Sequence, residues 1–414
     1  MIRLRERLHP TVLLMAGAHF MVDGYSNIYA PLLPLLIPRL GLSLAAAGTL
    51  TMVFQLAASV SQVGFGRLAD SWRPRLLVVI GPVVAVVVLS LIGLATTRTT
   101  LAIILFVGGL GGAAFHPPAA ALAHRLGGAR PGTAMSVHIT GGTLGFSMGP
   151  LLFAPFAERF GLEWTPLLAV PGLLVIALFI RHVPSFPQPQ AHQGSFAALR
   201  PYARPLTLLY LIVVLRTLTS LSFATFVPVM MTRRGASLGE AGFAVALFLF
   251  ASGIGGFFGG PAADRFGPRR VMAWSLLLAS PFLVVAPLVS GWSFLALMAI
   301  GGMFLQSTLP VNVVFGQSLA PVSAATVSSL MMGFAWGTGG LSVPLVGMIA
   351  DRVGIAPTLA GLALMPIAAA ALTLPLPASP QDFAATRASA PTGAEAPVGK
   401  LHQPAETVEP GSSS

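Results

Sequence analysis

Long apolar runs separated by short breaks rich in Arg, Gly and Pro fill most of the chain. Each run reaches about the 20 residues that an α-helix needs to cross the hydrocarbon core of a bilayer. The runs cover roughly residues 12–36, 43–66, 76–96, 100–123, 132–156, 164–183, 205–231, 238–262, 271–290, 293–318, 324–349 and 355–377. The pattern predicts an all-α integral membrane protein with twelve transmembrane helices.

The runs belong to a duplicated unit. Residues 34–75 repeat as residues 228–269 at a constant offset of 194, with no gap. Identical pairs include Pro34 and Pro228, Gly41 and Gly235, Ser43 and Ser237, Asp70 and Asp264, and Arg75 and Arg269. A duplicated hydrophobic half is typical of secondary transporters, which handle substrate between the halves near the bilayer midplane. We therefore expect two pseudo-symmetric six-helix halves, residues 1–183 and 204–377.

The composition narrows the class of protein. Hydrophobic residues make up 55% of the 414 residues and charged residues only 8%, whereas a soluble domain carries about 25% charged residues. The absence of cysteine excludes a disulfide scaffold and a thiolate metal site. The sequence has no metal-ligand motif, nucleophile elbow, phosphate loop or carboxylate pair. We therefore expect no enzyme, no metal site and no cofactor beyond a proton gradient.

The positive charges predict the orientation. Twelve spans place both termini on the same side of the membrane. With the N-terminus in the cytoplasm, 16 of the 23 Lys and Arg lie in cytoplasmic segments, 6 on the opposite side, and Arg216 inside a span. The positive-inside rule then places both termini in the cytoplasm and the protein in the plasma (inner) membrane. The net charge of +11 is thus explained by arginines in the loops that flank the membrane, and it needs no nucleic-acid partner. We expect a monomer whose partners are the bilayer and a small molecule.

Two segments lie outside the spans. Residues 184–203 are rich in proline and form the expected cytoplasmic linker, and residues 378–414, rich in Ala, Pro, Ser and Thr, form a tail expected to be disordered. Arg3, Arg5 and Arg7 before an apolar run resemble the start of a signal peptide. That run continues into a longer span, so an uncleaved first helix is expected.

Ionisable residues inside a span are costly and usually face the bundle interior. Asp23 is the only carboxylate well inside a predicted span, and helical spacing places His19 and Asn27 on the same face of that helix. Arg216 lies in the seventh run at the position equivalent to Val22, so it sits at nearly the height of Asp23. We expect Asp23 to carry a proton, and Arg216 to pair with Asp23 or with an anionic substrate.

Four other polar residues within the spans allow two interpretations. His116 and His138 lie in the fourth and fifth runs and serve either as proton or substrate groups or as packing side chains. Gln306 and Asn312 in the tenth run either line the substrate cavity or form interhelical hydrogen bonds. The sequence leaves both alternatives open.

Two loops at the ends of the second and eighth runs share a motif. The second copy follows G-x-x-x-D-R-x-G-x-R, and the first departs from it at Ser71 and Arg73. The motif resembles the signature loop of the major facilitator superfamily. We expect its aspartates to dock on the positive start of a helix in the other half and so control the conformational switch. The residues concerned are Gly66, Asp70, Arg75, Gly260, Asp264, Arg265 and Arg269.

A glycine stripe marks the fifth run. Gly141, Gly145, Gly149 and Pro150 form a G-x-x-x-G-x-x-x-G-P pattern. The pattern resembles the antiporter motif of exporters in that superfamily. Such stripes also serve as close helix-packing faces, and the two interpretations are compatible.

A closer resemblance covers residues 15–155. The segments His19-Phe-Met-Val-Asp23, Phe115-His116-Pro117 and Gly141 through Leu152 resemble the fosmidomycin-resistance branch of the superfamily. That resemblance implies a proton-coupled efflux antiporter for small drug-like, polar or anionic compounds, working by alternating access. The alternative is a proton-coupled or facilitative importer of sugars or organic anions, since a fold alone does not fix substrate or direction.

Overall fold

The computed structural model describes residues 10–71, 73–128, 131–184, 196–320, 323–379 and 382. Within these ranges every regular element is a helix, which confirms the expected all-α fold. The long elements are α1 (Pro10–Ser26), α2 (Tyr29–Leu40), α3 (Leu44–Gln55), α4 (Ser61–Ser71), α5 (Pro74–Ser90), α6 (Arg98–Leu126), α7 (Pro131–Phe160), α8 (Ala169–His182), α9 (Ala203–Arg233), α10 (Leu238–Phe266), α11 (Pro268–Val285), α12 (Gly291–Leu319), α13 (Ala324–Ser328), α14 (Ala335–Leu341), α15 (Val343–Val353), α16 (Ile355–Leu362) and α17 (Met365–Ala371). Short π-helices, η1 (Leu56–Val60) and η7 (Ser329–Phe334), join α3 to α4 and α13 to α14.

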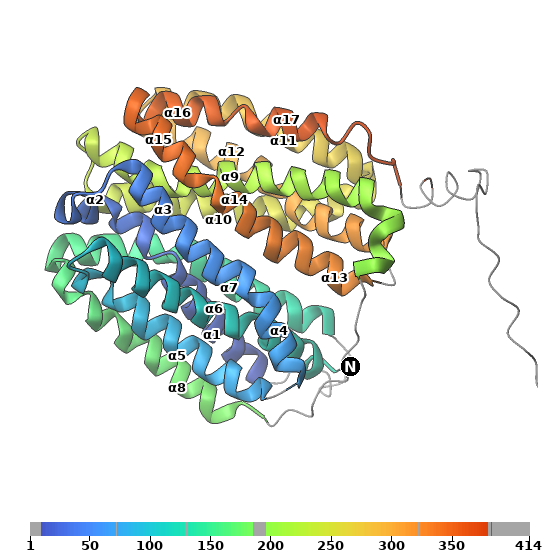
Figure 1. Cartoon of the computed structure of the whole chain (residues 1–414), viewed down its shortest axis with the longest axis horizontal. Coiled ribbons are helices and arrows are strands. Elements are labelled where there is room, and N and C mark those ends of the chain that lie inside the picture. Colours follow the sequence, from blue (N-terminus) through green and yellow to red (C-terminus); the bar gives the residue numbers. More distant parts are fainter. Residues whose placement is uncertain are drawn as a thin grey trace, which may run out of the picture.

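The helices fall on the twelve apolar runs. In the described ranges, nine continuous helices are long and apolar enough to cross a membrane. The first, fifth and twelfth runs fall on α1–α2, α7 and α16–α17, so a count of twelve spans is compatible with the structure. Figure 1 shows α1–α8 packed together and α9–α17 packed beside them. We call residues 10–184 the N-terminal half and residues 196–382 the C-terminal half; residues 185–195 of the expected linker and 383–414 of the expected tail lie outside the described residues.

The first run is broken because of its prolines. Pro31, in the first turn of α2, has no backbone N–H and cannot bond to the carbonyl of Asn27. The break is tied to α7, since the Asn27 side-chain amide donates to the carbonyl oxygen of Phe146 at 2.9 Å. The helix that carries His19 and Asp23 is therefore fixed against α7 at its end.

The glycine stripe of α7 packs directly on α1. A Cβ atom at Gly141, Gly145 or Gly149 would collide with a backbone carbonyl of α1, at Ala16, Phe20 and Gly24 respectively. Only glycine allows this approach, because the backbones of the two helices are in contact. The stripe thus holds α1 and α7 together as one unit.

Two carboxylates join the halves at one face of the molecule. Asp351, near the end of α15, accepts hydrogen bonds from the first two backbone N–H groups of α3, both at 2.9 Å. Glu158, near the end of α7, accepts from the first two backbone N–H groups of α10, also at 2.9 Å. We call these contacts the two carboxylate latches, and the face where α3 and α10 begin the latched face. Figure 1 shows α3 and α15 side by side at one of these contacts.

The latches occupy equivalent places in the two halves because α3 and α10 begin in the same way. Ser43 and Ser237 cap the two helices, each side chain accepting from a backbone N–H three residues on. Beyond the caps, a Cβ at Gly48 would lie 2.7 Å from the Val343 carbonyl oxygen. The equivalent atom at Gly242 would lie 2.6 Å from a carbonyl oxygen of α7. The halves therefore meet backbone to backbone beside each latch.

Candidate functional site

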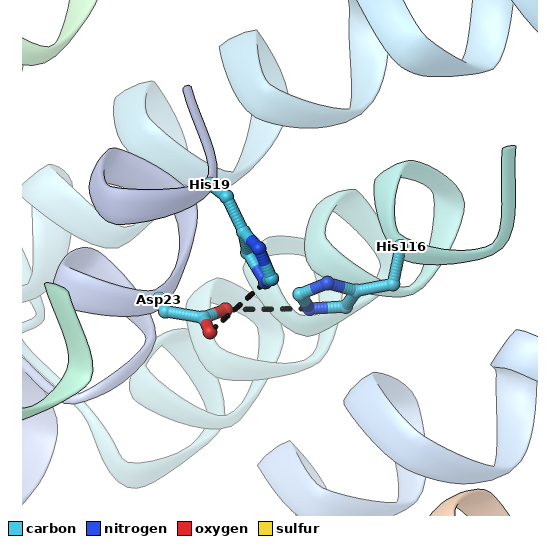
Figure 2. A group of neighbouring side chains, drawn as sticks. All are labelled: His19, Asp23 and His116. Carbon is cyan, nitrogen blue, oxygen red and sulfur yellow. Dashed lines mark ion pairs between the residues drawn. The ribbon is translucent and has the colours of Figure 1, made fainter. Parts of the chain in front are cut away.

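Four ionisable side chains meet inside the N-terminal half. His19 and Asp23 lie one turn apart on α1, His116 comes from α6 and His138 from α7. The His19 Nε2 is 3.2 Å from Asp23 Oδ2, and the His116 Nε2 is 3.4 Å from Asp23 Oδ1. Figure 2 shows both imidazoles turned toward the carboxylate. We call these four residues the histidine–aspartate cluster.

Both ring nitrogens of His19 face hydrogen-bond acceptors. Its Nδ1 lies 2.8 Å from the carbonyl oxygen of His138 and its Nε2 faces Asp23. A carbonyl and an ionised carboxylate only accept hydrogen bonds, whereas a neutral imidazole has a single N–H. Both contacts are satisfied if His19 is an imidazolium, or if a protonated Asp23 donates to Nε2. The geometry is therefore that of a pair able to hold one shared proton.

His138 and Phe115 fix the plane of the His19 ring. The His138 ring stacks on His19 with centroids 4.2 Å apart, and the fully buried Phe115 lies 5.8 Å away. The Nδ1 of His138 is buried and has no hydrogen-bond partner among the described residues. The structure thus brings His116 and His138, for which the sequence allowed two roles, into contact with His19. Their roles in transport stay predictions.

The cluster exists because Gly142 leaves space for it. A Cβ at Gly142 would lie 2.6 Å from the Asp23 Oδ2 and would also collide with the His19 ring. Gly142 was not among the residues predicted from the sequence, although it follows Gly141 of the stripe. Gly141 faces the backbone of α1, and Gly142, one residue on, faces the cluster.

Arg216 is separate from the cluster. It is fully buried in α9, where its guanidinium donates to Gln306 Oε1 and, at 3.2 Å, to Thr217 Oγ1. It also lies 5.4 Å from the centre of the Trp336 ring. No carboxylate within the described ranges pairs with it, and its Nε has no partner there. Of the two expected partners of Arg216, Asp23 is not in contact with it in this conformation, because the guanidinium turns toward Gln306 within the C-terminal half.

The other polar candidates take different places. Asn27 anchors the break between α1 and α2, and Gln306 serves as the acceptor for Arg216. Asn312 in α12 is fully buried, and neither polar atom of its side chain has a partner among the described residues. The C-terminal half therefore contains a buried cation and a buried amide with unused hydrogen-bonding capacity.

Asp264 of the second motif loop does not dock on a helix start among the described residues. Asp264 is exposed, and no hydrogen bond or ion pair connects it to another described residue; the side chain of Asp70 lies outside the description. A Cβ at Gly260 would meet no atom within 4 Å, and one at Gly66 only Pro117, at 3.8 Å. Arg75 and Arg265 are exposed, Arg265 over the ring of the next residue, and Arg269 is half-buried. Carboxylate docking on a helix start is found instead at Asp351 and Glu158, because this conformation joins the halves at the latched face.

The sequence did contain a signal for the latches. The segments Glu158-Arg159-Phe160-Gly161 and Asp351-Arg352-Val353-Gly354 share the acid-Arg-x-Gly order of Asp264-Arg265-Phe266-Gly267. All three segments end a helix at a glycine with positive φ, of 92°, 91° and 88° respectively. The same local structure therefore places a carboxylate one turn before the end of three helices.

Comparisons with known proteins agree with this architecture. The sequence model of the Major Facilitator Superfamily matches residues 15–215 and 208–401. The chain is 30% identical to the MFS-type transporter YfnC of Bacillus subtilis (strain 168), covering 87% of this chain and 91% of that protein. It is 29% identical to the fosmidomycin resistance protein of Escherichia coli (strain K12), covering 82% and 86%.

Solved structures share the fold. A bacterial homologue of the human lysosomal transporter Spinster, in an inward-facing and unoccupied conformation, aligns with a TM-score of 0.76 at 19% identity, over 91% of this chain and 96% of that one. The nucleoside transporter NupG aligns with a TM-score of 0.73 at 14% identity, over 92% and 99%. The chain therefore belongs to the major facilitator superfamily, and it is a multi-pass membrane transporter, not an enzyme.

Proposed function

We propose that the protein is a proton-coupled antiporter that exports a small polar or anionic compound. The observation that carries the proposal is His19, whose two ring nitrogens both face hydrogen-bond acceptors, so that the cluster binds a proton. The side chains of Asp23 and His116 are 20% and 25% exposed, which gives this proton a route to and from water. The names of relatives favour export, because they include fosmidomycin resistance and, at 28% identity, a chloramphenicol resistance protein of Streptomyces lividans.

Arg216 supports an anionic substrate. A fully buried guanidinium without a carboxylate partner is electrostatically uncompensated, and an anionic group of the substrate would supply the missing charge. Its planar fork suits a carboxylate or a phosphonate, which accepts two parallel hydrogen bonds. The proton site then belongs to the N-terminal half and the anion site to the C-terminal half.

Alternating access follows from the latches. With both termini in the cytoplasm, as the positive charges favour, the latched face is the outer face. The conformation described here is then closed to the outside by the two carboxylate latches. Opening the outer face requires both carboxylates to leave the helix starts, and the two halves rock about the central sites.

Transport in proteoliposomes tests the proposal. Purified protein is reconstituted with an imposed pH gradient of either sign and screened over antibiotics, phosphonates and carboxylates. We expect substrate to move against the proton flow, and Asp23→Asn to abolish uphill transport while substrate binding persists. Glu163→Gln, which removes an exposed carboxylate outside the cluster, the latches and the motif loops, is the matched control for proton coupling. Substrate that moves with the protons would indicate the importer instead, and uphill transport by Asp23→Asn at the normal rate would refute the role of the cluster.

A further inference from the structure

We propose that the histidine–aspartate cluster is also a binding site for one divalent first-row transition-metal ion, with His19, Asp23 and His116 as ligands. Their ligand atoms all lie within 4.8 Å of one another. Ligand atoms at about 2.0–2.1 Å from a tetrahedral Zn²⁺ lie roughly 3.3–3.4 Å apart. The two separations that join the histidines to Asp23 are 3.2 and 3.4 Å. These two separations, one to each oxygen of Asp23, are close to that value, and the three ligand atoms as a group lie within 4.8 Å, so a small side-chain movement would bring all three onto one ion.

The second hydrogen bond of His19 matches that of a metal ligand. Histidines that bind metals usually donate the other ring N–H to a carbonyl or carboxylate, which fixes the tautomer. Here Nδ1 meets the carbonyl of His138 at 2.8 Å, which leaves Nε2 to face Asp23. When the shared proton leaves, Nε2 and the carboxylate direct lone pairs at the same point. A cation that replaces the proton removes this repulsion.

The donor set selects the class of ion. Two imidazoles and one carboxylate suit Zn²⁺, Co²⁺ or Ni²⁺, whereas Mg²⁺ and Ca²⁺ prefer oxygen ligands alone. Three protein ligands leave a fourth tetrahedral position for water or for a donor atom of a substrate. The exposed part of His116 and Asp23 gives an ion access to that position. The spacing of these residues along the chain shows no metal motif, because the third ligand comes from another helix.

Metal binding does not depend on the direction or substrate of transport. Metal ligands bind in their deprotonated forms, so the metal and protons compete for the same atoms. A bound ion would therefore release protons on binding and would inhibit any transport that uses the cluster.

Metal titration of the purified full chain, without an affinity tag, tests the inference. Zn²⁺ binding is followed by calorimetry and Co²⁺ binding by its visible absorption, which reports nitrogen and oxygen ligands alone because the chain has no cysteine. We expect one ion per chain with release of protons, and at least a ten-fold loss of affinity in His116→Gln and in Gly142→Ala. The control is His182→Gln, because the His182 side chain is exposed, lies outside the cluster and contacts the Leu178 carbonyl oxygen of its own helix.

Two outcomes would overturn the proposal. One is the absence of a bound ion or of the Co²⁺ absorption bands in the wild-type chain. The other is equal affinity in the wild type and in both cluster variants. Thermal melting and size-exclusion profiles in detergent show whether His116→Gln remains folded. If it does not, Gly142→Ala decides, since it adds one methyl group beside His19 and leaves all three ligands in place.

Discussion

Removing the two latches is expected to open the latched face. Glu158→Gln and Asp351→Asn delete one negative charge each and leave a single oxygen where two accept backbone N–H groups at 2.9 Å. A charge at a helix start is worth up to ~2 kcal/mol in a partly buried place. Both carboxylates are exposed, so water screens them and about 1 kcal/mol each is the better figure. Since about 1.4 kcal/mol is a factor of ten, losing both shifts the ratio of open to closed molecules by roughly 30-fold.

Distance measurement between two spin labels reads this ratio directly. The chain has no cysteine, so Thr99→Cys and Ser293→Cys, at the exposed starts of α6 and α12, carry the labels without background. We expect one short distance in the otherwise unchanged chain and an added longer one in the double latch variant. Glu163→Gln, an exposed carboxylate near the same face, should leave the distances as they are. An unchanged distance distribution in the double latch variant would show that the latches do not hold the halves together.

Three further expectations follow from the site and the topology. Gly142→Ala places a methyl group against the cluster, so pH-driven transport in proteoliposomes should fall at least ten-fold while the melting temperature stays within a few degrees. Arg216→Lys keeps the charge but loses the planar fork, so calorimetry should show a larger loss of affinity, relative to the wild type, for an anionic substrate than for a neutral analogue. An equal loss for both ligands would argue against an anion site. Cysteines introduced at Arg200 and Arg98 should react with impermeant reagents from the cytoplasm and from outside respectively, and labelling of position 200 from outside would contradict the proposed orientation.

Helix positions could be predicted because the bilayer imposes them. A span must satisfy its backbone hydrogen bonds internally and be long enough to cross, so each apolar run coincides with helix. The sequence also predicted that His19 and Asp23 lie on the same face of one helix, because their spacing along a helix is enough to determine this. The approach of His116 and His138 could not be predicted, since it depends on how α6 and α7 pack on α1. No local pattern records that packing.

Arg216 shows the limit of arguing from repeat positions. Equivalence to Val22 says nothing about the direction of its side chain, which turns toward Gln306 within the C-terminal half. The latches were missed for a different reason. Glu158 and Asp351 lie at the ends of spans, where a charged residue costs little free energy and is therefore no sign of a functional site. Only the contacts between halves single them out.

The three acid-Arg-x-Gly helix ends have a thermodynamic consequence for the transport cycle. Two of them, at Glu158 and Asp351, are engaged at the latched face, and the third carboxylate, Asp264, is exposed at the opposite end of α10 and pairs with no other described residue. If Asp264 docks on a helix start when the opposite face closes, both end states are held by the same kind of contact. Neither state then gains much over the other from its latches. Binding of substrate or proton sets the balance between them, by about five-fold for each 1 kcal/mol of differential binding.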